Sequence, residues 1–331
     1  MSVKKVSPYV TFEGVPKEIK ASVCTITKRH EPLIDRMIEL LNGQTCLDFE
    51  YILVDGYYFQ RKDAMLELIE ELKPNFPVRY VPDKPTRWRG CRPALSSARN
   101  TYLIWARGEI IIGVDDCCAD MCLDLVEKHI HWGRRGFAVS GSWFDNCGWE
   151  SRHNFMEKAK VVDSGCFYGA NHSVMLEDIL KVNGYEELLD GEQGQEDCDL
   201  GIRLGRMGVK ILYEPDVWVE FDQSVHSLTQ WSPDSVKADW KKEGKPVEPK
   251  RRVLDDSKEH FANEWLTQQL KKDKDRTRPL GNPFDLRELR KIPPRYDYDV
   301  LKVHEALKEY IDPDLHDWRD EEKIEDMLGG S

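Results

Sequence analysis

The sequence predicts an α/β protein with a mostly parallel sheet and helices on both faces. Between residues 21 and 114, short β-branched apolar segments alternate with segments whose apolar residues recur at helical spacing. The segment 109–114 is almost continuously apolar, which is typical of a strand buried on both faces of a parallel sheet. The chain has 331 residues, of which 40% are hydrophobic, enough for one large domain with an extension.

The first half of the chain contains the clearest elements. Its β-branched and apolar runs predict strands at 21–27, 49–54, 78–81 and 109–114. Helical spacing between these strands predicts helices at 33–41, 62–73 and 94–106. Pro32 near the start of the first helix and Gly108 after the third are residues typical of those positions.

The later elements are spaced less regularly. The pattern predicts helices at 121–132, 174–183 and 197–207, and strands at 136–142 and 209–213. We expect residues 1–19 to be a lead-in and residues 20–230 to form the sheet domain. Residues 231–331, where charged helical stretches alternate with proline-bearing breaks, are expected to form a partly helical C-terminal extension.

Composition narrows the function classes. The chain has 48 Lys and Arg against 60 Asp and Glu, a formal net charge of -12, which disfavours a globally basic nucleic-acid binder. No apolar run approaches the ~18 residues that a membrane span needs, and the first residues lack the apolar core of a secretory signal. The nine cysteines are odd in number and contain no C-x-x-C pair. We therefore expect a cytoplasmic protein with reduced thiols.

Acidic residues stand at the ends of two predicted strands. Asp55 follows one, and the adjacent Asp115 and Asp116 follow another. In open α/β sheets, ligands bind beyond the carboxyl ends of the strands. Two adjacent carboxylates can share a hard cation such as Mg²⁺ or Mn²⁺, which is often shared with substrate phosphates. A solvated turn is the alternative, because Asp is common where strands end. The sequence has no glycine-rich phosphate loop, so the binding of a nucleotide would depend on a metal ion held by these carboxylates.

Four segments resemble motifs of family 2 glycosyltransferases. Residues 44–56 are similar to Q-T-x-x-x-F-E-x-x-x-V-D-D-G, and residues 95–100 to G-x-S-x-A-R-N. Residues 106–116 are similar to A-x-G-E-x-I-x-x-x-D-x-D, and residues 184–204 to G-Y/F…E-D-x-D-L-x-x-R-L. The motifs occur in the family's order between about residues 20 and 215, and the resemblance does not extend past roughly residue 230.

This resemblance implies a GT-A fold and an inverting transfer of a sugar from a nucleoside diphosphate donor, a UDP-sugar, to an acceptor hydroxyl. By match, Asp55 would bind the base or ribose, and Arg99 would lie near the nucleotide. Asp115 and Asp116 would hold the ribose and the diphosphate with Mn²⁺ or Mg²⁺. The other expected nucleotide-binding residues, at the end of the first strand, are Thr25, Thr27 and Arg29.

Two departures from the family pattern concern the metal. Cys117 stands where the motif has its second aspartate, and a thiolate is a soft, poor ligand for Mn²⁺ or Mg²⁺. Asp116 is then the remaining candidate ligand. The histidine that the family often supplies as a further ligand is expected near Glu220, whereas the nearest histidine is His226. His226 is our candidate, and Glu220 or Asp222 could supply an oxygen instead.

The base and the acceptor contacts are expected at the last motif. The resemblance and the spacing indicate Asp197 as the base that takes the acceptor's proton, with Glu196 binding acceptor hydroxyls. Both could instead be helix N-terminal acids that interact with the macrodipole. Trp143 and Trp149 are candidates for stacking on the acceptor sugar, although aromatic residues also fill cores.

Two other functions stay open. A degenerate GT-A domain could bind a sugar or a partner without turnover. A sugar-nucleotidyltransferase would need a glycine-rich basic loop after the first strand, where residues 27–30 have the charge but no glycine. The acceptor is unspecified: a saccharide, a protein, a small molecule or, with less support from the basic stretches 237–252 and 271–278, modified nucleic acid.

Overall fold

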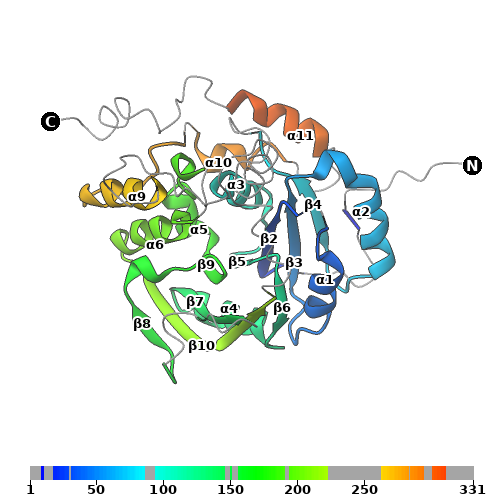
Figure 1. Cartoon of the computed structure of the whole chain (residues 1–331), viewed down its shortest axis with the longest axis horizontal. Coiled ribbons are helices and arrows are strands. Elements are labelled where there is room, and N and C mark those ends of the chain that lie inside the picture. Colours follow the sequence, from blue (N-terminus) through cyan, green and yellow to red (C-terminus); the bar gives the residue numbers. More distant parts are fainter. Residues whose placement is uncertain are drawn as a thin grey trace, which may run out of the picture.

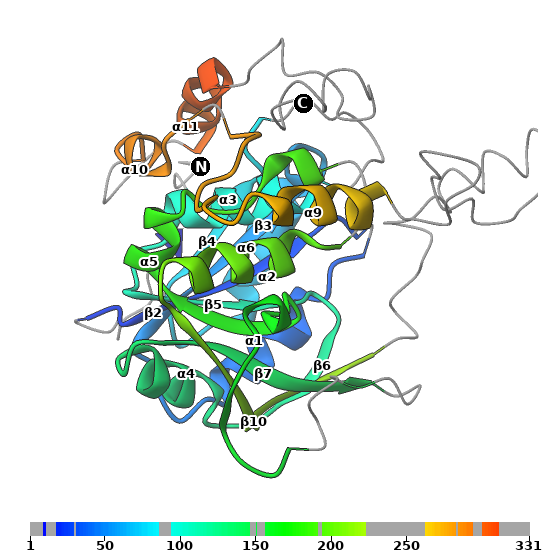
Figure 2. The ribbon, with the colours of Figure 1, turned by 90° about the vertical axis from the view of Figure 1, so that its left-hand side faces the viewer.

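The fold is an open sheet with helices packed against it (Figure 1). The computed structural model describes residues 9–10, 18–29, 31–85, 94–145, 150, 156–190, 194–222, 262–282, 284–293 and 300–310. Seen from the side, α5, α6 and α9 lie on one side of the sheet and α4 on the other (Figure 2). The predicted α/β class, with a sheet covered by helices, is confirmed.

The strands of the described residues form one ten-stranded sheet. The strands are β1 (Tyr9–Val10), β2 (Ala21–Thr27), β3 (Phe49–Asp55), β4 (Val78–Pro82), β5 (Ile110–Val114), β6 (Cys118–Met121), β7 (Phe137–Asp145), β8 (Lys160–Val162), β9 (Asn171–Met175) and β10 (Lys210–Phe221). Their order is β1-β4-β3-β2-β5-β9-β7-β10-β6, with β8 paired to β10 off this path.

Most of the long pairings are parallel, as expected. Strand β2 pairs in parallel with β3 and β5, β3 with β4, and β7 with β10. The exception inside the sheet is β9, which lies antiparallel between β5 and β7. The helix predicted at 174–183 is therefore shorter than expected, because its first residues belong to this strand.

The helices of the sheet domain lie where they were predicted, but several begin or end at other residues than predicted. They are α1 (Ile34–Asn42), α2 (Tyr58–Leu72), α3 (Leu95–Trp105), α4 (Leu125–Gly133), α5 (Leu176–Lys181), α6 (Glu196–Arg206), α9 (Ala262–Lys272), α10 (Leu286–Leu289) and α11 (Val300–Leu307). The prediction of a helix from residue 121 was wrong at its start, because Cys118–Met121 pairs with the end of β10 as β6. Strand β10 also runs past the predicted residue 213 to Phe221.

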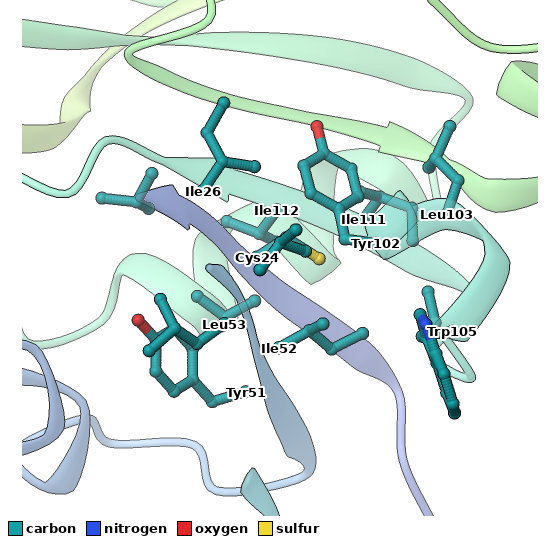
Figure 3. Close-up of a cluster of buried hydrophobic side chains, with 14 of the residues drawn as sticks. Cys24, Ile26, Tyr51, Ile52, Leu53, Tyr102, Leu103, Trp105, Ile111 and Ile112 are labelled. Carbon is teal, nitrogen blue, oxygen red and sulfur yellow. The ribbon is translucent and has the colours of Figure 1, made fainter. Parts of the chain in front are cut away.

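The core under the candidate site consists of apolar side chains from β2, β3, β5 and α3. Figure 3 shows this cluster, which includes Cys24, Tyr51, Tyr102 and Ile112, each at most 1% exposed. Burying a large apolar side chain contributes roughly 1.5–3 kcal/mol. Because β2 is flanked by β3 and β5, this packing fixes the carboxyl ends of three neighbouring strands relative to one another.

The C-terminal helices pack onto the sheet domain. Helix α9 contacts α6, and α10 contacts α3. Their apolar residues Leu266, Leu270, Leu286 and Leu289 are at most 1% exposed. Within the described parts of the chain, no helix combines the length and the apolar character that crossing a membrane requires.

Candidate active site

A cavity of about 240 Å³ lies at the carboxyl ends of β2 and β5 and at the start of α6. It brings together many of the residues singled out in the sequence. Those that line it are Arg99, Asp115, Asp116, Trp143, Glu196 and Asp197. The strand ends and the first turn of α6 thus converge on one hollow, as a site at the end of an open sheet requires.

Asp116 is held by Thr27, the last residue of β2, and by Arg29 in the loop that follows β2. The Thr27 hydroxyl donates to Asp116 Oδ2 at 2.7 Å, and Arg29 Nε lies 2.9 Å from the same oxygen. The Arg29 side chain is 2% exposed and that of Asp116 is 11% exposed. Removing one member of an ion pair this buried strongly destabilises the fold, because the other charge is left without its partner. Asp116 therefore has both a fixed orientation and a nearby countercharge.

Arg99 connects the acidic pair with the acids of α6. Its Nη2 atom lies 3.8 Å from Asp115 Oδ1 and 3.4 Å from Glu196 Oε1. Arg99 and Glu196 are buried, whereas the Asp115 side chain is 36% exposed. One guanidinium thus balances charge on both carboxylates, and Asp115 keeps access to the cavity.

Asp197 is oriented by backbone N–H groups. Its Oδ2 atom accepts from the Gly169 N–H at 2.6 Å, and its Oδ1 atom accepts from the Cys198 N–H at 2.7 Å. The Gly169 carbonyl in turn accepts from Arg99 Nη1 at 3.4 Å and lies 3.0 Å from His172 Nδ1. The peptide group at Gly169 therefore connects the proposed base to Arg99 and to a buried histidine.

Gly169, His172 and Tyr185 also belong to the site, although none of them was predicted as a site residue. His172 is fully buried, and its Nε2 atom lies 3.0 Å from the Tyr185 hydroxyl. Burial lowers the pKa of His172 well below its ordinary value, so the ring is neutral. The only signal in the sequence was Tyr185 in the Gly184-Tyr185 motif, because nothing in the sequence marked Gly169 or the strand Asn171–Met175 to which His172 belongs.

Gly169→Ala is expected to reduce activity strongly with a small effect on the fold. A Cβ atom at residue 169 would lie 2.6 Å from Arg99 Nη2, so the guanidinium would have to move. Its contacts with Glu196 and Asp115 would be disturbed, whereas the core would stay intact. Parallel measurements of turnover and of the melting temperature check this, and an alanine variant with normal turnover would contradict it.

Glu196 is a titrating group near neutrality. Burial raises its pKa to about 7, the negative charge of Asp197 adds to that rise, and Arg99 opposes it. A carboxyl whose folded-state pKa lies above its unfolded value contributes stability that is complete below the unfolded pKa of 4.5. That contribution is lost as pH rises through the folded-state pKa, by at most roughly 3 kcal/mol.

Glu196→Gln should therefore change the pH dependence of stability. Glutamine does not titrate, so the free energy of unfolding of wild type should fall relative to that of the variant between about pH 5 and about pH 8. Denaturant unfolding of both proteins at several pH values measures this difference. A difference that stays constant with pH would show that Glu196 does not titrate in this range.

Asp55 lies outside the cavity. It is fully buried, and its oxygens accept from Arg61 at 2.7 and 2.6 Å, from the Tyr80 hydroxyl at 2.6 Å and from the Tyr57 N–H at 2.7 Å. Arg61 Nη1 also donates to the Arg29 carbonyl at 2.5 Å. In this structure Asp55 thus supports the segment that bears Arg29, and its contact with a nucleotide stays a prediction.

The other predicted residues are placed as follows. Thr25, Thr27 and Asp116 line a small hollow next to the cavity, together with Tyr51 and Met37. Trp143 lines the main cavity, with its ring centroid 6.1 Å from that of Phe221. Asp222 is paired with Arg36 Nη1 at 3.3 Å. Trp149 and His226 lie outside the described residues, so their roles stay predictions.

The donor atoms at Asp115 and Asp116 fit a divalent cation in part. Carboxylate oxygens suit Mn²⁺ and Mg²⁺, which usually complete their coordination with water and substrate phosphates. Cys117 is 2% exposed, and burial together with Asp115 and Asp116 raises the pKa of its thiol, so it stays protonated. Among the described side chains, no group of three or more His, Cys, Asp or Glu could hold a metal ion. The residues thus fit a two-carboxylate site that a bound diphosphate would complete.

Comparison with known proteins agrees with the site. The sequence model of glycosyl transferase family 2 matches residues 22–173, from β2 into β9. This match includes Asp55, Arg99, Asp115 and Asp116. Residues 22–173 are therefore similar to glycosyl transferase family 2. No curated protein sequence matches the chain.

Solved structures share the fold. TarS 1-349 from S. aureus has a TM-score of 0.51 at 13% identity, over 88% of this chain and 91% of that chain. TarS 1-349 in complex with UDP has a TM-score of 0.49 at 16% identity, over 66% of this chain. The mannosyltransferase PcManGT from Pyrobaculum calidifontis, in complex with GDP-Man and Mn²⁺, has a TM-score of 0.46 at 19% sequence identity, over 61% of this chain. The present chain spans 62% of the UDP-bound TarS chain and 56% of PcManGT. The likeness to TarS 1-349, with its TM-score of 0.51, shows the GT-A fold.

Proposed function

We propose that this protein is a metal-dependent, inverting glycosyltransferase that moves a sugar from a nucleoside diphosphate sugar, a UDP-sugar, to an acceptor hydroxyl. One observation carries the proposal. A single cavity is lined by Asp115 and Asp116 at the end of β5 and by Glu196 and Asp197 at the start of α6, with Arg99 in contact with both groups. The family 2 match over residues 22–173 supports the same reaction class.

The reaction is a single displacement at the anomeric carbon. The acceptor oxygen forms a bond to that carbon while the bond to the diphosphate oxygen breaks, and the diphosphate leaves with the electron pair. Asp197 takes the acceptor's proton, because its carboxylate lines the cavity and is oriented by the Gly169 N–H. Glu196 and Trp143 line the same cavity and would contact the acceptor.

The leaving diphosphate requires positive charge. Mn²⁺ or Mg²⁺ held by Asp115 and Asp116 would supply it by neutralising the developing charge on the diphosphate. The protein adds the guanidiniums of Arg99 and Arg29, which lie next to Asp115 and Asp116 respectively. Thr25 and Thr27 beside the small hollow would hold the nucleoside end of the donor.

A thermal-shift panel tests donor binding. UDP-sugars, GDP-sugars and their free nucleotides are added with Mn²⁺ or with a chelator. A ligand that binds only the native state at about 100 times its Kd stabilises it by roughly 2.7 kcal/mol. We expect a rise in melting temperature with UDP ligands that is larger with Mn²⁺. If none of these nucleotides shifts the melting temperature, the proposal fails.

The rival function is a binding protein without turnover, which Cys117 in the place of a motif aspartate favours. A pure binder shows the thermal shift but releases no nucleotide. Release of UDP from a bound UDP-sugar in the presence of Mn²⁺, either to an acceptor or to water, therefore separates an enzyme from a binder.

A further inference from the structure

The C-terminal segment 262–282 lies outside the family match and packs behind the acids of the candidate site. Helix α9 runs beside α6 in both views (Figures 1 and 2) and contacts it. Arg206, the last residue of α6, donates to the carbonyls of Arg276 at 2.8 Å and Lys271 at 3.0 Å. The helix that begins with Glu196 and Asp197 is thus attached at its far end to this segment.

Asn263 attaches the same segment at the near end. Its side chain is 1% exposed, and its Nδ2 atom donates to the Leu189 carbonyl at 2.8 Å and to the Gly194 carbonyl at 2.9 Å. Gly194 lines the cavity and is separated from Asp197 by two residues. One buried amide therefore bonds to the backbone on both sides of residues 191–193.

The backbone that Asn263 holds is unusual. Gly194 has a φ of +89° and Gln195 a φ of +77°, directly before the first turn of α6. A left-handed conformation is strained for a residue with a side chain, such as Gln195. Such strain persists only where surrounding contacts enforce it. The hydrogen bond to the Gly194 carbonyl is one of those contacts.

A buried ionic cluster fixes the position of the segment itself. Arg276 Nη1 lies 3.2 Å from Glu186 Oε2, and its Nη2 atom contacts Asp199 of α6. Glu186 also accepts from the Leu280 and Gly281 N–H groups at 2.7 Å each. These three charged side chains are at most 6% exposed. Buried charges thus tie the segment to α6 and to Glu186.

We propose that Asn263 is a positioning residue that holds the backbone entering α6, and with it Glu196 and Asp197, in the arrangement that the reaction needs. The C-terminal segment is then a working part of the active site. This inference rests on the proposed role of Asp197 as the base. The donor side of the cavity is held by β2 and β5, and the acceptor side by α6. A change at Asn263 should therefore affect the acceptor side and leave the donor side in place.

Asn263→Ala should consequently lower kcat and leave the donor KM nearly unchanged. Two lost hydrogen bonds of about 0.5–1.5 kcal/mol each correspond to a fall in kcat of about fivefold to about 150-fold. The rate is measured as UDP release from the UDP-sugar that gives the largest thermal shift. Hydrogen–deuterium exchange of the amides from 189 to 200 should become faster in the variant.

Arg206→Ala is the matched control for lost packing. It removes the bonds to Arg276 and Lys271 but leaves both Asn263 bonds in place. We expect it to lower the melting temperature at least as much as Asn263→Ala does, with kcat and exchange at 189–200 close to wild type. Gln268→Ala, a change at an exposed residue of α9, should alter none of these readouts.

Two results would overturn the inference. One is unchanged exchange at 189–200 in Asn263→Ala, and the other is an equal loss of kcat in Arg206→Ala. Failure of wild type to release UDP from any donor would refute the proposed function instead. The exchange comparison needs no substrate, so it would still decide whether Asn263 holds this backbone.

Discussion

Asp197→Asn is expected to abolish sugar transfer while the donor still binds. Removing a general base costs about 10²–10⁴-fold in rate, because asparagine cannot accept the acceptor's proton. The amide has nearly the same shape, and its oxygen can still accept from the Gly169 N–H, while the Cys198 N–H loses its acceptor. The effect on the fold should therefore be small, and the donor side should be unaffected. UDP release measures the rate, and the thermal shift with UDP and Mn²⁺ measures binding.

Asp178→Asn provides the control for this variant. Asp178 lies in the first turn of α5, as Asp197 does in α6, and it pairs locally with Lys181 at 2.9 Å. Its replacement should leave turnover and donor binding at wild-type values. Near-normal turnover by Asp197→Asn would remove Asp197 from the role of base.

Asp116→Asn is expected to cost both stability and donor binding. The variant leaves the buried Arg29 guanidinium without the carboxylate 2.9 Å away, and breaking a buried ion pair costs about 3–5 kcal/mol. The same carboxylate is a proposed ligand for the cation at the diphosphate. We therefore expect a lower free energy of unfolding and no Mn²⁺-dependent thermal shift with UDP.

Asp115→Asn separates these two effects. The Asp115 side chain is 36% exposed, and its distance to Arg99 is 3.8 Å, so its loss should change stability by much less. It should nevertheless reduce the Mn²⁺-dependent shift. Denaturant unfolding and thermal shifts of both variants test the pair. An Asp116→Asn protein as stable as wild type, with its metal-dependent shift intact, would contradict the account.

The part of the site that lies on the first strands could be predicted because its strands are buried apolar runs. The runs ending at Thr27, Asp55 and Val114 are recognisable in the sequence, and their carboxyl ends meet at one edge of the sheet. The surroundings of Asp55 could not be predicted in the same way. The sequence places it at the strand end, but its enclosure by Arg61 and Tyr80 comes from contacts that no local pattern reveals.

Strand β9 was missed because its polar residues resemble a loop. Asn171, His172 and Ser173 are all fully buried. Their polar groups are satisfied by distant partners: His129 lies 2.8 Å from the Ser173 hydroxyl and 3.1 Å from Asn171 Oδ1. Buried polar groups that are paired in this way cost little, but the pairing depends on the tertiary fold.

The positioning contacts were beyond prediction for a related reason. Gly169 donates its own backbone N–H to Asp197, and Asn263 donates to the backbone carbonyls of Leu189 and Gly194. Any residue can provide such a backbone group, so these bonds leave no mark on the sequence. Residues 262–282 also lie beyond the motif resemblance, so only the structure connects them with Asp197.

The most direct test of the central claim is the position of a bound metal. Crystals grown with UDP and Mn²⁺ would locate the ion through its anomalous scattering. We expect one Mn²⁺ coordinated by Asp115 or Asp116 and by the diphosphate, in the cavity that Asp197 also lines. UDP bound elsewhere, or Mn²⁺ bound away from both aspartates, would contradict it.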